Sequence, residues 1–224
     1  MTTERGRTCI SGLRVLVTAG PTCEDIDPVR YITNRSSGRM GVAMALAAAD
    51  RGAQVDLIHG PLSVAVPRHE NINAAAVRSA QDMHDVVMER APEVDVAIMC
   101  AAVADFAPVQ TADRKIKKDV DGVPRIELQR TPDILADLGA LKTHPFLVGF
   151  AAETDDIENN ALQKMAKKNC DMICANDVSE SGSGFGSETN RLTICLREGA
   201  PIRLPMLQKS EAAERILDEI EANL

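Results

Sequence analysis

Five segments of the sequence combine glycine, hydroxyl, amide and basic residues in patterns that suit the binding of a phosphorylated ligand. The first two cover residues 18–22 and 34–41. A glycine lets the backbone approach a phosphate closely, and hydroxyl and free N–H groups at the start of a helix attract anions. The same residues could instead form a tight turn and an ordinary helix cap, with Ser37 or Ser36 as the N-cap residue. The candidate anion-binding residues of these two segments are Gly20, Ser36, Gly38 and Gly41.

The third segment consists of small residues that follow a strongly apolar run. Residues 101–104 read Ala-Ala-Val-Ala, and Asp105 comes next. Small side chains leave room for a flat ligand, and Asp105 offers a carboxylate at the rim of such a site. A simple chain crossing with a solvated Asp105 would give the same sequence pattern.

The last two segments supply basic side chains. Residues 115–118 read Lys-Ile-Lys-Lys within a long predicted loop, which suits a phosphate clamp but also an ordinary solvated surface. Lys164 and Lys168 are four residues apart and so share one face of a predicted helix. They could flank a nucleotide, or they could form structural ion pairs with Glu158 or Asp155.

The five segments lie between predicted strands and helices, which alternate along the chain: short apolar runs indicate the strands, and longer stretches with apolar residues at helical spacing indicate the helices. Strands are predicted at residues 13–18, 55–58, 72–77, 94–101, 146–150 and 172–175, and helices at 38–51, 79–90, 131–141, 157–168 and 210–222. Pro132 is expected in the first turn of its helix, and residues 191–196 and 201–205 are expected to form an edge pair. The pattern predicts an α/β fold, with a Rossmann-like, mainly parallel sheet and helices on both faces. Ligands bind such sheets at the carboxyl ends of the strands, so the segments are expected to form one site.

Two stretches do not fit this alternation. Residues 108–130 are charged, and residues 178–190 are rich in serine and glycine. Loops of this length in a compact domain are usually functional or mobile.

Composition restricts the class of partner and the cellular location. The 224 residues have a net charge of −8 and only 2% aromatic residues, which argues against a nucleic-acid partner. No apolar run reaches the roughly 18 residues of a membrane helix, and residues 1–7 lack the apolar stretch of a secretory signal. The six cysteines form no CxxC pair, which predicts a reduced, cytoplasmic protein. The four histidines are scattered, which argues against a histidine-ligated metal or a histidine-based triad.

Missing motifs narrow the type of nucleotide chemistry. No GxGxxG follows the first predicted strand, and no GxxxxGK[ST] occurs anywhere. Residues 58–61, at the end of the second predicted strand, include no acid that could bind a ribose. These absences disfavour NAD-dependent hydride transfer and a P-loop, and leave a site suited to a nucleoside triphosphate. A nucleotide-cofactor oxidoreductase and a non-catalytic nucleotide-sensing module remain as alternatives on the same fold.

Eight motifs, in order from about residue 13 to the C-terminus, resemble those of phosphopantothenoylcysteine synthetase, the CTP-dependent bacterial phosphopantothenate–cysteine ligase. They are Thr18-Ala19-Gly20-Pro21-Thr22-x-Glu24, Asp27-Pro28-Val29-Arg30, Asn34-Arg35-Ser36-Ser37-Gly38, Ala101-Ala102-Val103-Ala104-Asp105, Lys115-Ile116-Lys117-Lys118, Thr131-Pro132-Asp133-Ile134, Gly149-Phe150-Ala151-Ala152-Glu153-Thr154 and Ala175-Asn176-Asp177-Val178. The chain departs from the family at Cys23-Glu24-Asp25, where Arg-Glu-Pro is usual. We expect Cys23 to be exposed and all six cysteines to be dispensable for chemistry.

The resemblance implies a ligase of coenzyme A biosynthesis with a two-step reaction. The carboxylate of 4′-phosphopantothenate attacks the α-phosphate of CTP, which gives an acyl-cytidylate and pyrophosphate. The amine of L-cysteine then attacks the acyl carbon and releases CMP. Mg²⁺ is expected with the triphosphate, and Asp105 is the first candidate for its protein ligand.

Residue roles follow from the same resemblance. Asn34 is expected to be catalytic, as a hydrogen-bond donor to the acyl-cytidylate, and Lys115 to reach the CTP phosphates from a mobile loop. Substrate-binding roles are implied for Arg30, Asn34, Ala101, Ala102 and Asn176. Nucleotide-binding roles are implied for Gly20, Ser36, Gly38, Gly41, Met99, Cys100, Ala101, Asp105, Lys115, Pro132, Asp133, Ile134, Leu135, Phe150, Lys164 and Lys168.

The resemblance also implies an assembly. Arg30 is expected to reach phosphopantothenate bound in a partner subunit, which implies a homodimer. Residues 1–12 would be a tail, residues 13–224 a single ligase domain, and 108–130 both the phosphate loop and a dimerisation arm. Most bacterial members are fused to a flavin-dependent phosphopantothenoylcysteine decarboxylase, which is thus an expected fused or separate partner. No membrane partner is expected.

Overall fold

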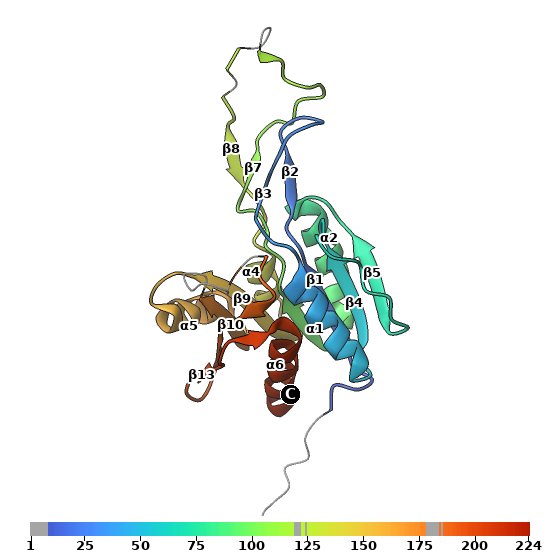
Figure 1. Ribbon diagram of the computed structural model, residues 1–224, viewed down its shortest axis with the longest axis vertical. Coiled ribbons are helices and arrows are strands. Elements are labelled where there is room, and N and C mark those ends of the chain that lie inside the picture. The colour runs from blue at the N-terminus through green and yellow to red at the C-terminus, as the bar shows by residue number, and fades with distance from the viewer. Residues whose placement is uncertain (1–8, 119–121, 124, 178–183, 185) are drawn as a thin grey trace, which may run out of the picture.

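An eight-stranded sheet in the order β13-β12-β10-β9-β6-β1-β4-β5 forms the centre of the computed structural model (Figure 1). The structure describes residues 9–118, 122–123, 125–177, 184 and 186–224. The six strands from β10 to β5 are parallel, and β12 and then β13 join by antiparallel pairing. The strands are β1 Arg14–Ala19, β4 Gln54–His59, β5 Ile72–Ala76, β6 Val96–Met99, β9 Phe146–Glu153, β10 Met172–Asp177, β12 Leu192–Leu196 and β13 Ile202–Arg203. This topology confirms the predicted Rossmann-like, mainly parallel sheet and its antiparallel edge pair.

The central strands are apolar on both faces, and helices cover both. In β1 every residue after Arg14 is buried, and all four residues of β6 are buried. Because neighbouring side chains of a strand point to opposite faces, such a strand is stable only between two covering layers. The helices are α1 Arg39–Asp50, α2 Ala80–Arg90, η1 Ala91–Glu93, α4 Ile134–Gly139, α5 Ile157–Lys168 and α6 Lys209–Asn223.

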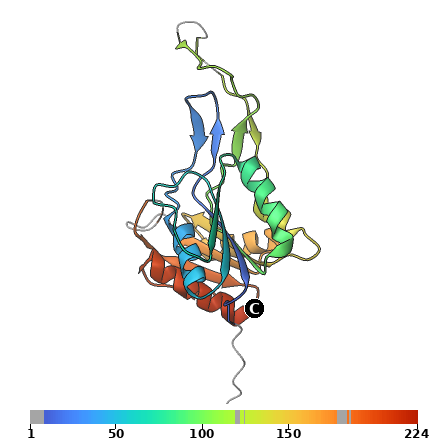
Figure 2. The same cartoon turned by 90° about the vertical axis from the view of Figure 1, so that its right-hand side faces the viewer.

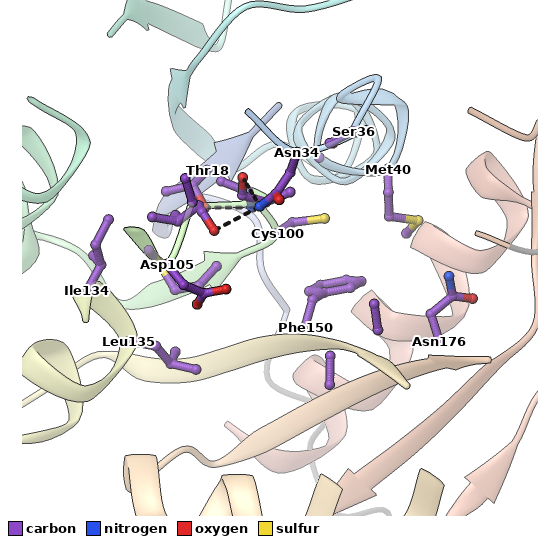
Figure 3. Close-up of a pocket in the computed structure, with 18 of the residues that line it drawn as sticks. Thr18, Asn34, Ser36, Met40, Cys100, Asp105, Ile134, Leu135, Phe150 and Asn176 are labelled. Carbon is purple, nitrogen blue, oxygen red and sulfur yellow. Dashed lines mark hydrogen bonds between the residues drawn. The ribbon is translucent and has the colours of Figure 1, made fainter. Parts of the chain in front are cut away.

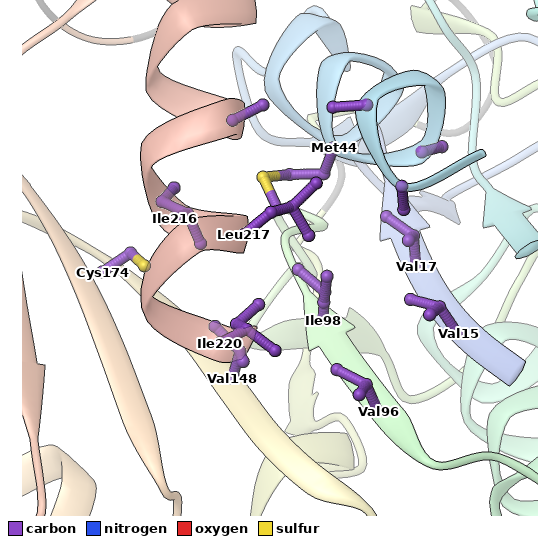
Figure 4. Close-up of a cluster of buried hydrophobic side chains, with 14 of the residues drawn as sticks. Val15, Val17, Met44, Val96, Ile98, Val148, Cys174, Ile216, Leu217 and Ile220 are labelled. Carbon is purple, nitrogen blue, oxygen red and sulfur yellow. The ribbon is translucent and has the colours of Figure 1, made fainter. Parts of the chain in front are cut away.

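Helices α1 and α6 pack on one face, and α2, α4 and α5 on the other (Figures 1 and 2). On the first face Met44 of α1 and Leu217 of α6 lie over Ile98 of β6 (Figure 4). On the second face Leu16 and Leu147 of the sheet belong to the cluster that the other helices cover. Each of these fully buried side chains contributes about 1.5–3 kcal/mol to folding. The hydrophobic cores on the two faces of the sheet thus hold the carboxyl ends of its strands in place.

Helices α2 and α4 each begin at a side-chain cap. Ser79 caps α2: its Oγ accepts a hydrogen bond from the Asp82 N–H at 3.0 Å, and the Asp82 carboxylate accepts one from the Ser79 N–H at 2.9 Å. A helix lies within the predicted range 131–141, but its predicted start at residue 131 was wrong. Asp133 accepts the Ala136 N–H at 3.1 Å as the cap, so α4 begins at Ile134 and Pro132 lies outside its first turn. A capping carboxylate satisfies a free helix N–H, which a proline cannot do.

Two short hairpins project together beyond the carboxyl edge of the sheet (Figures 1 and 2). The first pairs β2 Cys23–Asp25 with β3 Tyr31–Thr33, and the second pairs β7 Phe106–Pro108 with β8 Leu128–Arg130. They are joined where Ala112 donates its backbone N–H to the Ile26 carbonyl at 2.9 Å. We call residues 23–33 and the described part of 106–130 the arm. The stretch 108–130 was predicted as one long loop, but its two ends are strands of this arm.

The environment of Cys23 differs from the prediction. Cys23 is only 3% exposed, because β2 is hydrogen-bonded at this residue to the Arg78 carbonyl at 2.8 Å. Cys9 is the exposed cysteine instead. The expectation of an exposed Cys23 was therefore wrong.

A short ribbon and the last helix close the described chain. Strands β11 Thr189–Asn190 and β14 Leu207–Gln208 pair antiparallel just before α6. Of the Ser/Gly-rich stretch 178–190, residues 178–183 and 185 lie outside the described residues. Among the helices that the structure describes, none has the length and apolarity needed to cross a bilayer.

Candidate functional site

A cavity of about 690 Å³ opens at the carboxyl ends of β1, β6, β9 and β10 (Figure 3). Figure 3 shows Ile134, Leu135 and Asp105 on one side of the cavity and Met40 and Asn176 on the other. Phe150 lies between the two groups. The cavity lies at the position where open parallel sheets bind their ligands.

Seventeen of the predicted site residues line this cavity. They are Asn34, Ser36, Gly38, Gly41, Met99, Cys100, Ala101, Ala102, Asp105, Pro132, Asp133, Ile134, Leu135, Phe150, Lys164, Lys168 and Asn176. Gly20, Arg30 and Lys115 do not line it. The structure thus brings together residues as far apart in the chain as Asn34 and Asn176, and leaves three predicted residues outside.

Asn34 enters the cavity between two strand ends. Its Nδ2 donates hydrogen bonds to the backbone carbonyls of Ala102 at 3.1 Å and Val103 at 3.0 Å. Both partners are carbonyl oxygens, which can only accept, so the orientation of the amide is determined. Both N–H groups of Asn34 are therefore used, and its Oδ1 is the atom left for a ligand.

The start of α1 brings backbone N–H groups to the cavity. Gly38 caps the helix with a φ of 80°, a conformation that favours glycine, and Ser36 Oγ accepts its N–H at 3.3 Å. A Cβ on Gly41 would lie 2.8 Å from the Thr18 carbonyl oxygen, so only glycine lets α1 approach β1 this closely. The helix N-terminus is a suitable anion site.

Gly20 has a supporting position instead of a ligand-facing one. Its φ of 78° directs the chain beneath Gly38, and its carbonyl accepts the Ala102 N–H at 2.9 Å. A Cβ on Gly20 would lie 3.1 Å from the Pro61 carbonyl oxygen. The glycine is thus explained by close packing around the turn after β1.

Threonine hydroxyls fix the small-residue segment that follows β6. Thr18 Oγ1 accepts the Ala101 N–H at 3.1 Å, and Thr22 Oγ1 accepts the Ala104 N–H at 3.0 Å. Thr131 Oγ1 donates to the Ala104 carbonyl at 2.6 Å. These bonds keep the backbone of this segment in place while its small side chains leave the cavity open.

The two predicted α5 lysines have partners other than those considered from the sequence. Lys164 Nζ donates to the Phe150 carbonyl at 3.0 Å, and burial lowers the pKa of this lysine. Lys168 forms an ion pair with Asp133. Burial acts to raise the Asp133 pKa, but the hydrogen bonds from Lys168 and the Ala136 N–H outweigh it, so the net pKa is lowered. The alternative of structural ion pairs with Glu158 or Asp155 was therefore wrong for both lysines.

Arg30 and the Lys115 segment meet on the arm, outside the cavity. The buried Asp27 carboxylate binds the Arg30 guanidinium and accepts the Ile116 N–H at 3.2 Å. Arg30 also donates to the Ile116 carbonyl at 2.9 Å. The guanidinium hydrogen bond holds the pKa of Asp27 well below its usual range. Asp27 therefore ties the basic segment to the tip of the first hairpin.

The sequence analysis assigned no binding role to four charged or amide side chains of the cavity wall. They are Arg39, Arg130, Asn190 and Lys209. Lys209 opens α6, and Asn190 lies in the Ser/Gly-rich stretch that was flagged only for its length. The cavity wall has five basic side chains, Arg39, Arg130, Lys164, Lys168 and Lys209, against two acidic ones, Asp105 and Asp133. In a chain of net charge −8, this local excess of positive charge favours an anionic ligand.

The donor set for a metal is small. Among residues 9–118, 125–177 and the other described positions, no three His, Cys, Asp or Glu side chains gather as a metal site. Asp105 is exposed at the cavity rim, and Asp133 is engaged by Lys168. Mg²⁺ that is bound mainly by the phosphates of a ligand needs only one or two protein carboxylates, so the single available carboxylate of Asp105 would be sufficient.

Comparisons with known proteins agree with this architecture. Residues 10–224 match the model of the DNA/pantothenate metabolism flavoprotein C-terminal domain. The coenzyme A biosynthesis bifunctional protein CoaBC of Vibrio cholerae is 48% identical over 215 residues, which is 95% of this chain and 53% of that protein. The chain thus spans about half the length of the curated relatives that it matches.

Solved structures give the same result. The crystal structure of the C-terminal domain of a CoaBC protein is 42% identical, with a TM-score of 0.81, and the match covers 96% of this chain and 97% of that one. A DNA/pantothenate metabolism flavoprotein from Streptococcus pneumoniae is 26% identical with a TM-score of 0.80, over 95% of this chain and 100% of that one. The chain therefore belongs to the family of the DNA/pantothenate metabolism flavoprotein C-terminal domain, of which the C-terminal domain of CoaBC is a member.

Proposed function

We propose that this chain is a phosphopantothenate–cysteine ligase of coenzyme A biosynthesis, which uses CTP and forms an acyl-cytidylate. The observation that carries the proposal is the basic cavity at the sheet edge, with Asn34 held between the ends of two strands. The curated relatives named above act in coenzyme A biosynthesis, which supports the pathway.

The nucleotide is proposed to lie along the side formed by α4, α5 and the start of α1. Ile134 and Leu135 offer an apolar surface for the base, and Lys164 and Lys168 offer hydrogen-bond donors beside it. The N-terminus of α1, with Ser36 and its backbone N–H groups, suits the phosphates. This arrangement leaves the α-phosphate near Asn34 and residues 101–102.

In the first step, a carboxylate oxygen of 4′-phosphopantothenate attacks the α-phosphorus of CTP. The bond from that phosphorus to the bridging oxygen breaks, and pyrophosphate leaves with the electron pair. Mg²⁺, with Asp105 as its proposed protein ligand, would neutralise charge on the phosphates. The lysines beside the nucleotide, Lys164 and Lys168, and the N-terminus of α1 stabilise the same charge in place, which is the main form of catalysis for a reaction that needs no enzyme nucleophile.

In the second step, the amine of L-cysteine attacks the acyl carbon. The carbon–oxygen bond to the cytidylate phosphate breaks, CMP leaves with the electron pair, and the cysteine ammonium loses two protons to solvent in all. The Asn34 Oδ1 can accept an N–H of the incoming amine. Burial raises the pKa of the Cys100 thiol to about 12, so this cysteine stays protonated and does not compete as a nucleophile.

The assembly belongs to the proposal as well. We propose a cytoplasmic homodimer in which the arm places Arg30 and Lys115 at a cavity, with Arg30 serving the partner subunit. Both residues lie outside the cavity of their own chain, so either the arm or the second subunit must bring them to it. A flavin-dependent decarboxylase, fused or separate, would use the phosphopantothenoylcysteine produced.

The proposal is tested by incubating the chain with CTP, 4′-phosphopantothenate and L-cysteine, and measuring pyrophosphate and CMP. We expect pyrophosphate to form with CTP and phosphopantothenate alone, and CMP to appear when cysteine is added. Binding of CTP without any pyrophosphate would favour the nucleotide-sensing module. Thermal stabilisation by NADPH but not by CTP would favour the oxidoreductase.

A further inference from the structure

The end of the cavity beyond Phe150 contains two buried polar side chains, Lys209 and Asn190, to which the ligase scheme assigns no partner. Figure 3 shows Met40 and Asn176 at this end of the cavity. Asn190 lies in the ribbon that precedes α6, and Lys209 is the first residue of α6. Strand pairing sets Asn190 opposite Leu207, two residues before Lys209.

Lys209 is a buried cation without an ion-pair partner among the described residues. It is 8% exposed, and its Nζ donates to the backbone carbonyls of Gly184 at 3.2 Å and Ser187 at 2.5 Å. Among the described residues, two of its three N–H groups thus have a partner. The neighbouring Glu188 pairs with Arg39 at 2.9 Å instead. Since a buried charge is costly without a counter-charge, this position favours an anionic ligand group.

Asn190 adds a second unsatisfied group. It is 5% exposed, and its Oδ1 is the buried side-chain atom without a hydrogen-bond partner in the described part of the chain. Its Nδ2 donates to the Met40 sulfur at 3.6 Å, so the amide nitrogen has a partner and the oxygen has none. A carboxamide oxygen only accepts, and leaving it unpaired in a buried place is unfavourable. A ligand with a hydrogen-bond donor next to its negative charge would satisfy both side chains, once a rotation of the Asn190 amide brings its fully buried Oδ1 to the cavity.

A zwitterionic amino acid meets both demands. Its carboxylate matches Lys209, and its amino group donates to the Asn190 Oδ1. A phosphate group matches Lys209 alone, because at neutral pH it offers few protons to an acceptor. The sulfur atoms of Met40 and Cys100 also line the cavity, and Lys209 lies close enough to Cys100 to influence its pKa. Polarizable sulfur suits a thiol side chain.

We propose that this end of the cavity is the amino-acid subsite of the proposed ligase. Lys209 binds the α-carboxylate of L-cysteine, the Asn190 Oδ1 accepts an N–H of its amino group, and the thiol lies against Met40 and Cys100. A neutral amide suits the reaction, because a carboxylate at position 190 would hold the amine as an ammonium without a lone pair. The inference rests on the proposed function for the identity of the amino acid.

The test compares L-cysteine with cysteamine, which lacks the carboxylate, in the wild-type chain and in Lys209→Met. We expect the wild type to prefer L-cysteine in kcat/KM. Lys209→Met should lower kcat/KM for L-cysteine by roughly 10- to 100-fold and change that for cysteamine little, so the preference collapses. The KM for CTP and the release of pyrophosphate before cysteine is added should stay unchanged. Lys142→Met, at an exposed position outside the cavity, is the matched control.

A second variant covers the case in which Lys209→Met fails to fold. Asn190→Asp supplies an internal counter-charge to Lys209, so the fold should persist. It should lower kcat/KM for L-cysteine at least roughly tenfold, because the new carboxylate competes with the α-carboxylate and holds the amine as an ammonium. Only the second effect acts on cysteamine, so cysteamine should lose less. Lys209→Arg should restore part of the preference.

Two other outcomes separate the subsite from the ligase scheme. An unchanged preference for L-cysteine over cysteamine in both variants would overturn the subsite. A rise in the KM for CTP alone would also overturn it, and would assign Lys209 to a phosphate of the nucleotide. Calorimetric binding of L-cysteine provides the independent readout. If the wild type releases no pyrophosphate but binds L-cysteine through Lys209, the ligase scheme fails and the subsite stands.

Discussion

The side-chain nitrogen of Asn34 donates a hydrogen bond to the backbone carbonyl of Val103 over 3.0 Å. Its second N–H is also donated to backbone, to the Ala102 carbonyl. The sequence led us to expect Asn34 to donate to the reacting acyl or phosphate group. The structure leaves only its Oδ1 for a ligand, which makes Asn34 an acceptor that suits an incoming amine.

Asn34→Ala should therefore impair the attack of cysteine more than the formation of acyl-cytidylate. Removing one positioned hydrogen-bonding group at a reacting centre typically costs about 10²–10³ in rate. Rapid-quench measurement of both half-reactions should show the intermediate accumulating. Asn223→Ala, an amide change at the exposed end of α6, is the control. Equal losses in both steps would leave Asn34 with a structural role only.

The contact of Asp27 with the basic segment of the arm gives a prediction of local stability. Asp27→Asn removes the ion pair with Arg30 and weakens the bond to the Ile116 N–H. Trypsin should then cleave near Lys115 and Lys117 roughly tenfold faster, because opening of this part of the arm costs less free energy. Asp113→Asn, at an exposed position of the same arm, should cleave at the wild-type rate.

The pH dependence of this contact follows from the Asp27 pKa. The guanidinium of Arg30 lowers the pKa of Asp27 in the folded chain relative to the unfolded chain. The stabilisation is therefore present above the ordinary aspartate pKa near 4 and is lost as pH falls toward the folded value. The difference in trypsin sensitivity between wild type and Asp27→Asn should be constant from pH 6 to 8. A difference that shrinks within that range would contradict the assignment.

Mixing of two inactive variants tests the proposed dimer. Arg30→Ala removes a residue proposed to serve the partner subunit, and Asn34→Ala removes one that serves its own cavity. If each acts as proposed, re-equilibrated mixtures form heterodimers with one intact site, and roughly a quarter of wild-type activity should return. Activity that stays at the level of the separate variants would show that Arg30 acts within its own chain, or not at all.

Thiol labelling tests the burial of the cysteines. At pH 8, iodoacetamide should label Cys9 alone, and after denaturation all six cysteines. Burial raises the pKa of Cys100 and of Cys170 to about 12, which reduces their reactive thiolate roughly 10³-fold relative to a free cysteine. Rapid labelling of Cys23, detected by peptide mass spectrometry, would contradict the buried position of β2.

The parts that could be predicted from the sequence are those encoded locally. The apolar run of β1, the capping Ser79 of α2 and the glycines around Gly38 act through neighbouring residues, so the sheet, the helices and most of the cavity wall were correct. The three-residue strands of the arm have no apolar run, because pairing between distant segments forms them. Lys209 and Asn190 carry no motif, and only the pairing of β11 with β14 brings them to the cavity.

The most direct test of the account follows the carboxylate oxygens of 4′-phosphopantothenate. With ¹⁸O in both carboxylate positions, formation of an acyl-cytidylate leaves one labelled oxygen on phosphorus when cysteine displaces CMP. Mass spectrometry of the products should find one ¹⁸O in CMP, one in the new amide and none in pyrophosphate. Label in inorganic phosphate together with CDP would mean attack at the γ-phosphate, and unlabelled CMP would mean that no acyl-cytidylate forms; either result would contradict the proposed reaction.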